Sequence, residues 1–255
     1  MKHYHGGPIT PASCAMKAWK NGFAFVSWAH TSQLHLALDI SQGVGIDNGA
    51  FTFWKKTKKI DWDDYYSFIE SIKNHPRYDF CIIPDVIDGG EVENDILLSE
   101  WDLNRCGAGV PVWHMNESDE RFIRLCNDYD RVAIGSCGEH DVSKPASCVS
   151  KLKDVIRHVV DDNGYPITKL HMLRGLNKSI FKNLPFASAD STNIARNIGI
   201  DKNWSKGNYQ PKSKEVRAYV MKNNIESVNS ASSLIYNEDT DKTSIQMALK
   251  FNQQG

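Results

Sequence analysis

The sequence has few cysteines and no long apolar run. Its six cysteines are scattered, without a C-x-x-C pair or the spacing of a disulfide framework, so we expect reduced thiols. No apolar stretch approaches the roughly 18 residues that span a bilayer, and the polar opening MKHYHGG lacks the apolar segment of a signal peptide. These absences predict a cytoplasmic protein without a membrane partner.

The sequence also lacks an excess of charge of either sign. Its 30 Lys and Arg residues nearly balance 31 Asp and Glu residues, and the formal net charge of −1 gives no overall attraction to a polyanion. Any contact with nucleic acid must therefore come from local basic patches. Two clusters are candidates, although a solvated loop is the commoner explanation for each: Lys55, Lys56, Lys58 and Lys59 form one, and Lys202, Lys206, Lys212, Lys214 and Arg217 form the other.

The order of residue types predicts an α/β fold. Short β-branched or aromatic runs alternate with segments of helical period, which is typical of a parallel sheet with crossover helices. Seven strands are expected, at residues 23–28, 44–47, 79–84, 110–114, 131–135, 169–173 and 186–189. One helix begins at Asp61 as N-cap, with a buried stripe of Trp62, Tyr66, Ile69 and Ile72; others are expected at residues 91–104, 118–129, 145–162 and 213–223.

A closed barrel is the architecture that best fits this alternation. At 255 residues the chain is close to the roughly 250 that a (β/α)8 barrel needs. No eighth strand is recognisable, because residues 200–211 and the tail from Ser227 are polar. We therefore predict a single domain over residues 1–255, a (β/α)8 TIM-type barrel that is distorted or incomplete in its C-terminal part. A doubly wound open sheet is the alternative.

Acidic residues collect where the expected strands end. In parallel α/β folds, catalytic groups come from the carboxyl ends of the strands. Asp47, Asp85 and Asp190 each close or follow such a strand. A lone Asp there is more often a helix cap or a turn former. Three that converge on one barrel mouth would instead suit the nucleophile and the general acid/base of retaining glycosyl transfer.

Six short segments carry a resemblance to a known family. They are DNGAF (47–51), IIPD (82–85), VWH (112–114), AIGSCGE (133–139), HMLRG (171–175) and ASADSTNIARN (187–197). In order and approximate spacing they resemble the characteristic segments of the tRNA-guanine transglycosylase family, over about residues 44–197. The order of the six segments carries this resemblance more than any single segment does.

The resemblance implies roles for individual residues. Asp190 corresponds to the nucleophile that attacks the ribosyl C1′ and holds the sugar covalently. Asp47 corresponds to the acid/base residue that moves the proton of the leaving and entering bases. Asp85 corresponds to the residue that reads guanine, because a carboxylate can accept from N1–H and from the exocyclic amine. The rest of the base pocket would comprise Phe51 as a stacking ring, Asn48, His114, Gly135, Ser136, and Met172 with Leu173 as a wall.

Departures from the family pattern limit what the resemblance implies. His114 stands where the family has Gln, and Ser136 where it has a second Gly, so the identity of the base stays open. No cysteine follows Cys148, so the family's zinc cluster cannot form, and neither a metal nor another cofactor is expected. His3 and His5 are a weak metal signal that is more typical of a surface loop.

The lack of a zinc cluster favours a resemblance to the short transglycosylases that phages and bacterial DNA-modification clusters encode. We predict an enzyme that replaces guanine in DNA by a 7-deazaguanine base of the preQ0 type, in the host cytoplasm if a phage encodes it. Three alternatives stay open: queuine- or preQ1-type exchange in tRNA, a non-catalytic nucleic-acid-binding subunit, and an unrelated glycoside hydrolase that uses the same carboxylates. The chain could act as a homodimer or together with a partner subunit.

Overall fold

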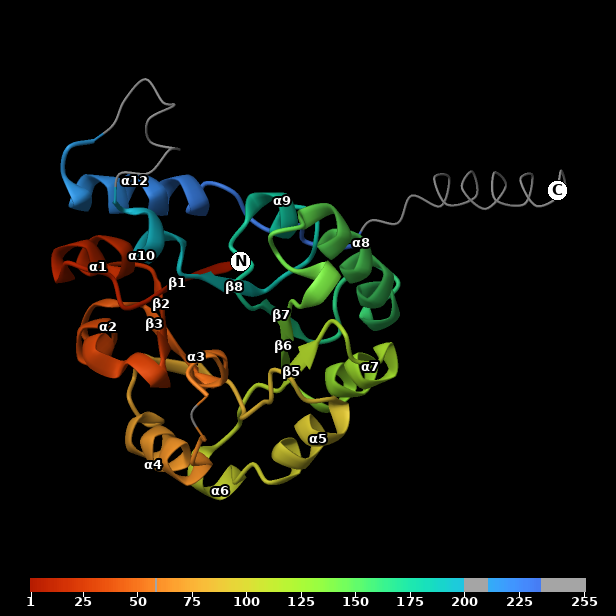
Figure 1. The fold of residues 1–255 in the computed structure, drawn as a ribbon. Coiled ribbons are helices and arrows are strands. Elements are labelled where there is room, and N and C mark those ends of the chain that lie inside the picture. Colours follow the sequence, from red (N-terminus) through yellow and green to blue (C-terminus); the bar gives the residue numbers. More distant parts are fainter. Residues whose placement is uncertain (58, 200–210, 235–255) are drawn as a thin grey trace, which may run out of the picture.

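Eight parallel strands form one curled sheet inside a ring of helices in the computed structural model, which describes residues 1–57, 59–199 and 211–234 (Figure 1). The strand order is β4-β3-β2-β1-β8-β7-β6-β5, so neighbours follow the chain order around a barrel and do not reverse as in a doubly wound sheet. The strands are β1 (Lys2–Gly6), β2 (Phe23–Ser27), β3 (Gly43–Asp47), β4 (Tyr78–Cys81), β5 (Val112–His114), β6 (Arg131–Gly135), β7 (Lys169–Met172) and β8 (Ser188–Ser191).

The seam of the barrel lies between β4 and β5, the two ends of the strand order. A single parallel bridge, between Ile82 and Val110, joins them. The amide of Val110 donates to the carbonyl of Cys81 at 2.8 Å, and the amide of Ile83 donates to the carbonyl of Val110 at 2.9 Å. The predicted TIM-type fold is confirmed, but this irregular part lies in the middle of the chain, and not in the C-terminal part as expected.

The eighth strand of the barrel is β1, at the start of the chain. It pairs with β2 on one side and β8 on the other. His3 and His5 are therefore buried strand residues, and the expectation that they lie in a surface loop is wrong. Their ring nitrogens lie at hydrogen-bond distance from the carbonyl of Val228 (2.9 Å) and the carboxylate of Glu226 (3.0 Å). The predicted loop at residues 200–211 lies, apart from Pro211, outside the described residues.

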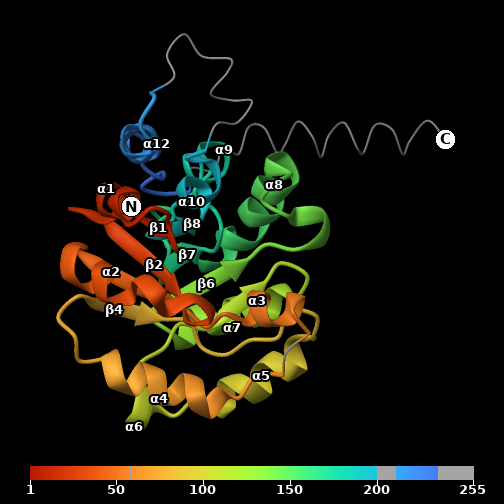
Figure 2. The ribbon, with the colours of Figure 1, turned by 60° about the vertical axis from the view of Figure 1, so that its left-hand side comes forward.

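The helices cover the outside of the strands, as the two views of the ribbon agree (Figures 1 and 2). The longer ones are α1 (Ala12–Trp19), α2 (Leu34–Ile40), α4 (Trp62–Ile72), α5 (Glu91–Ser99), α7 (Asp119–Asp128), α8 (Pro145–Ile156) and α12 (Lys214–Glu226). Shorter ones are α3 (Ala50–Lys55), α6 (Leu103–Cys106), α9 (Lys178–Phe181) and α10 (Asn193–Asn197), with 3₁₀ turns at Trp28–Gln33, Gly138–His140 and Arg157–Val159. Among the described residues, no helix combines the length and the apolar character that a membrane crossing requires.

Aspartate caps determine where two of the helices begin. α4 begins after Asp61 as predicted, because the Asp61 carboxylate accepts from the amide of Asp63 at 3.0 Å. Tyr65 is fully buried, and its hydroxyl donates to the carbonyl of Ile82. Of the expected stripe of α4 only Ile69 is fully buried, beside Tyr65, whereas Trp62, Tyr66 and Ile72 are partly buried.

The single helix expected at residues 91–104 is instead two, α5 and α6, because Asp102 caps a new helix by accepting from the amides of Asn104 and Arg105.

The interior of the barrel is filled by an aromatic layer. Tyr4, Phe25, Phe80 and His171 point inward from four strands, with ring centroids 5.2–6.1 Å apart. Below them, near the amino ends of the strands, the Tyr4 hydroxyl donates to Asp79, which also pairs with Lys2 at 2.5 Å and Arg131 at 3.6 Å. Aromatic rings and paired charges thus fill the lower half of the barrel, and the candidate residues lie above them, at its carboxyl end.

Gly45 tests how tightly this layer is packed. A Cβ atom at Gly45 would lie 2.8 Å from the Phe25 ring and 3.0 Å from the Phe80 ring. Substitution Gly45→Ala should therefore lower the free energy of unfolding by about 1–3 kcal/mol, measured by urea denaturation. Gly199→Ala is the matched control, because nothing lies within 4 Å of a Cβ there. Equal unfolding midpoints for the two variants would contradict the close packing.

Candidate active site at the barrel mouth

Four of the residues predicted from sequence meet at the carboxyl ends of the strands. Asp47 closes β3, Asp85 follows β4, His114 closes β5 and Asp190 lies in β8. Asp85 and His114 are 2.8 Å apart, and the charges of both Asp190 and Asp85 act on the Asp47 carboxyl. Residues that are up to 143 positions apart in the chain are thus brought to one mouth.

Asp190 is a buried carboxylate that is held by backbone. Only 5% of the residue is exposed, and its Oδ1 accepts from the amide of Arg174 at 2.8 Å. It does not cap the helix that follows, because the first amide of α10, that of Asn193, donates to the Ser191 hydroxyl instead. The carboxylate of Asp190 is therefore fixed at the ends of β7 and β8. Its second oxygen, Oδ2, accepts no hydrogen bond from the described residues.

His171 lies directly beneath Asp190 and was not predicted. Its Nε2 is 3.5 Å from Asp190 Oδ1, and its Nδ1 lies 2.8 Å from the Ser188 hydroxyl. The ring is fully buried, and Nε2 has no hydrogen-bond partner within the described structure. The alternation of strand residues could have revealed it, because positions 171 and 173 of β7 and its extension point inward together.

Asp47 is the carboxyl with the most perturbed ionisation. Burial, together with the neighbouring charges of Asp190 and Asp85, raises the pKa of Asp47 to about 7. The Ser27 hydroxyl and the Gly49 amide, which donates to Asp47 Oδ2 at 3.2 Å, oppose this rise. Near neutral pH this carboxyl is present in both its protonated and its ionised form, which is what a general acid/base requires.

Asp85 is held from both sides by residues that were expected to touch substrate. Asn48 donates through Nδ2 to Asp85 Oδ1 (2.6 Å) and to the carbonyl of Ile83 (2.8 Å), and accepts from the amide of Ala50. Asn48 is 2% exposed, and its hydrogen bonds hold Asp85 in place. The other Asp85 oxygen lies 2.8 Å from His114 Nε2.

The ionisation of His114 depends on this pair. Burial alone would lower the pKa of His114, but the hydrogen bond and the negative charge of Asp85 outweigh it and raise the pKa above its usual value. The ring packs against Gly135, where a Cβ atom would lie 2.7 Å from Nδ1. The His114 amide donates to Glu117 Oε2, which also binds Arg121 at 2.7 Å, and this buried ion pair was missed from sequence.

Three further predicted residues have different surroundings. The Ser136 hydroxyl is buried beside the mouth without a hydrogen-bond partner in the described structure, so it can serve a ligand. Phe51 contacts Trp54 and lies beneath two cations, Lys55 (4.5 Å) and Arg174 (5.1 Å). Met172 is fully buried in the core between the strands and the outer helices, so its expected place in a pocket wall is wrong. Leu173, the next residue, does face the interior cluster.

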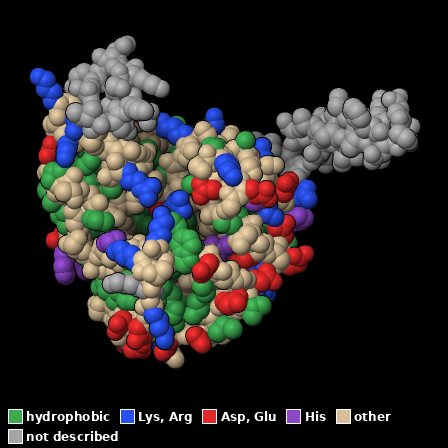
Figure 3. All heavy atoms as spheres, in the orientation of Figure 1, with side chains coloured by type: hydrophobic (Ala, Val, Ile, Leu, Met, Phe, Trp, Pro, Cys, Tyr) green, Lys and Arg blue, Asp and Glu red, His purple; other side chains and the backbone are tan. Residues whose placement is uncertain are grey.

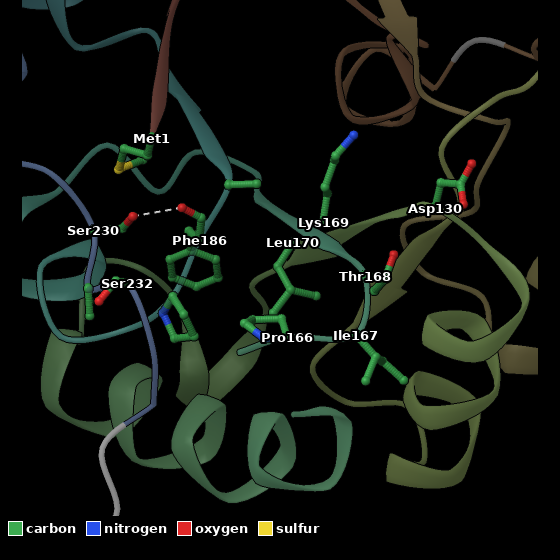
Figure 4. A pocket seen from close by; sticks show the side chains of 13 residues that line it. Met1, Asp130, Pro166, Ile167, Thr168, Lys169, Leu170, Phe186, Ser230 and Ser232 are labelled. Carbon is green, nitrogen blue, oxygen red and sulfur yellow. Dashed lines mark hydrogen bonds between the residues drawn. The ribbon is translucent and has the colours of Figure 1, made fainter. Parts of the chain in front are cut away.

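A cavity lies at the opposite end of the barrel, away from the acidic residues of the mouth (Figure 4). Its volume is about 720 Å³, and it is lined by residues at the amino ends of β7 and β8, among them Met1, Asp130, Lys169 and Phe186. That end of a TIM-type barrel generally contributes stability and not catalysis. Within the described part of the chain, no three His, Cys, Asp or Glu side chains are grouped so that they could hold a metal ion.

Comparison with known proteins does not identify a family. The chain matches no protein-family model and no curated protein sequence. The chemistry of the mouth therefore has to be inferred from the arrangement of its own residues.

The raised pKa of Asp47 predicts a pH dependence of stability. The pKa of Asp47 in the folded state, about 7, lies above the ordinary aspartate value of 3.8, so the folded state binds this proton more tightly than the unfolded state. The contribution of Asp47 to the free energy of unfolding should thus fall as pH rises from about 4 to about 7. Asp47→Asn should remove this fall and stabilise the protein at pH 8 by up to about 4 kcal/mol, measured by urea denaturation.

The control for Asp47→Asn is Asp162→Asn, which changes an exposed carboxylate. It should leave the pH profile of the wild type unchanged. A profile for Asp47→Asn that runs parallel to the wild type would show that the Asp47 carboxyl titrates normally.

The Asp85–His114 pair predicts a second titration. In the wild type, the His114 imidazole should titrate above 6.5, whereas in Asp85→Asn it should titrate below 6.5, because burial remains and the carboxylate is lost. Nitrogen-detected NMR of the histidine side chains measures both values. Glu139→Gln removes a carboxylate that is 82% exposed and should leave His114 unchanged. An unaltered His114 in Asp85→Asn would contradict the assigned pair.

Proposed function

We propose that this chain is a base-exchanging glycosyltransferase that replaces guanine in DNA by a 7-deazaguanine base through a covalent Asp190–sugar intermediate. The observation that carries the proposal is the meeting of three carboxylates with different surroundings at one barrel mouth. Asp190 is fixed by a backbone amide, Asp85 is paired with a histidine, and Asp47 has a pKa of about 7. The resemblance of the six sequence segments agrees with this division.

The first half-reaction uses Asp190 and Asp47. The Asp190 carboxylate attacks C1′ of the target nucleotide, a C1′–O bond forms, and the bond from C1′ to the base nitrogen breaks. The departing guanine keeps the electron pair of that bond and takes a proton from the protonated Asp47. With a pKa of about 7, Asp47 can hold that proton at neutral pH and still release it.

The second half-reaction runs the same steps in reverse with the incoming base. Asp47, now ionised, removes the ring N–H proton of the 7-deazaguanine, and the ring nitrogen attacks C1′. The bond between C1′ and Asp190 breaks, and the carboxylate of Asp190 is restored. Each proton and each electron pair is thus returned, so the exchange consumes no cofactor.

Base recognition falls to the groups around Asp85. An ionised carboxylate offers about four acceptor positions, of which Asn48 and His114 occupy two. The remaining positions can accept from the N1–H and the amine of a guanine-like base. The Ser136 hydroxyl, which has no hydrogen-bond partner among the described residues, can donate to a base oxygen. The half-buried ring of Phe51 can stack on a base.

DNA is the preferred polymer because the chain lacks the cysteines of a zinc-binding tRNA-docking element after Cys148. The target nucleotide has to leave the base stack to reach the buried Asp190 carboxylate, as for other enzymes that act on a base. If the base were exchanged in tRNA and not in DNA, the same chemistry would be assigned to tRNA.

The experiment that tests the proposal measures label transfer. Purified protein is incubated with guanine-containing single-stranded DNA or with tRNA, plus a radiolabelled 7-deazaguanine or guanine, and polymer-bound label is counted. Label should enter DNA, and Asp190→Asn should lower the rate by at least about 10³-fold. The wild type should also form a denaturation-resistant adduct with DNA that Asp190→Asn does not form.

The control is again Asp162→Asn, an exposed carboxylate-to-amide change that should retain both label transfer and the adduct. Label in tRNA alone would move the proposal to tRNA. Label in neither polymer, or an adduct that persists in Asp190→Asn, would overturn the assigned chemistry.

A further inference from the structure

A polar groove lies beside Asp190 on the rim of the barrel mouth. Its volume is about 670 Å³, within the range of small-molecule sites, and the loops that follow β7 and β8 form most of its lining. Ser191 and Thr192, which come directly after Asp190, line one side, and Arg174, whose amide holds Asp190, lines the other. The groove and the candidate nucleophile are therefore built from the same two loops.

The lining of this groove is cationic. It contains the three cations Arg174, Lys178 and Arg196, against the single carboxylate of Asp141. Asp141 lies 3.8 Å from the Arg174 guanidinium, so it offsets that cation only. In the space-filling view, Lys and Arg side chains gather toward the middle of the face that carries the barrel mouth, and Asp and Glu toward its lower and right-hand edges (Figure 3).

The two other cations are placed to meet a ligand. Arg196 is exposed on α10, and the structure shows no ion pair for it among the described residues. Lys178 donates to the Asn224 side chain at 2.7 Å and to the Ser227 hydroxyl at 3.3 Å, both neutral groups, so its charge is not neutralised. Hydroxyl groups of Ser191 and Thr192 add neutral donors between the cations.

The lysine clusters expected from sequence are weaker candidates for such contacts. The ammonium of Lys55 already lies over the Phe51 ring, at 4.5 Å from its centroid. Arg217 is 4% exposed and donates to the carbonyls of Ile198, Pro211 and Lys212, so it is a buried structural residue and not a surface contact. Lys58, Lys202 and Lys206 lie outside the described residues.

We infer that this groove binds the phosphodiester backbone of the nucleic-acid strand next to the nucleotide whose base is exchanged. The ligand is polyanionic, which matches two uncompensated cations, and guanidinium and ammonium groups are the usual partners of phosphate oxygens. The inference rests on the proposed function for the identity of the strand. It adds where the strand runs: over the loops after β7 and β8, with Lys178 and Arg196 on successive phosphates.

Binding can be tested without the exchange reaction. The probe is a fluorescein-labelled single-stranded DNA without guanine, and its affinity is measured by anisotropy at several salt concentrations. For the double variant Lys178→Ala/Arg196→Ala, we expect affinity at low salt to fall roughly 25-fold, about fivefold per cation. The slope of log affinity against log salt should become shallower by about 1.4, since each lost contact with a single strand removes about 0.7.

The control is Lys153→Ala, which removes an exposed cation from α8 away from the groove. It should leave affinity and salt slope at the wild-type values, and the thermal midpoints of all variants should agree. An unchanged slope in the double variant, or a wild type that does not bind the probe at low salt, would overturn the groove assignment.

Failure of the groove and failure of the proposed function give different results. Groove-dependent binding without label transfer would overturn the exchange chemistry and leave the groove as a nucleic-acid site. Label transfer with equal KM for DNA in the wild type and the double variant would overturn the groove and leave the exchange chemistry in place.

Discussion

The site depends on the aromatic layer that closes the barrel beneath it. Tyr4, Phe25 and Phe80 fill the interior, and the charges around Asp79 close the end below them. A carboxyl above an apolar floor loses hydration that nothing below replaces, which is the largest cause of the raised pKa of Asp47. The residues that stabilise the barrel thus also set the chemistry at its open end.

The three carboxyl groups at the mouth differ in their hydrogen-bond partners. Asp190 receives a backbone N–H, and Asp85 receives the side-chain amide of Asn48 and pairs with the imidazole of His114. Asp47 has only the Gly49 amide and the Ser27 hydroxyl beside it, and it feels both neighbouring charges. The proton therefore goes to Asp47. The surroundings of the three side chains thus differ, although all three are aspartates.

Sequence reasoning found the parts of this arrangement that depend on local pattern. The alternation of strands and helices, the N-cap at Asp61 and the acidic strand ends were predicted, and the structure brings the acidic residues together. It missed β1, because two of the strand's residues, His3 and His5, are polar. Their ring nitrogens have partners at Val228 and Glu226, more than 200 positions away in the chain, which no local pattern reveals. It also misplaced Met172, since a shift of one residue along β7 exchanges the barrel interior for the outer core.

The same shift explains why His171 was overlooked. A segment read as HMLRG suggests that its apolar residues face a base, yet the pleat turns Met172 outward and places His171 and Leu173 inside. The sequence shows that His171 and Leu173 face one side of the strand and Met172 the other. Which side is the barrel interior depends on the neighbouring strands. In β8 the matching inward residues are Ser188 and Asp190, and it is their register with β7 that seats the imidazole below the carboxylate.

Arg174 connects the mouth to the groove on its rim. It adopts a left-handed backbone conformation (φ 58°), which costs a non-glycine residue of the order of 1 kcal/mol and has to be held by its surroundings. Its amide holds Asp190, while its guanidinium lies over Phe51 and near Asp141. A phosphate in the proposed groove would compete with Asp141 for this guanidinium. The mouth and the groove on its rim therefore share Arg174, through its amide on one side and its guanidinium on the other.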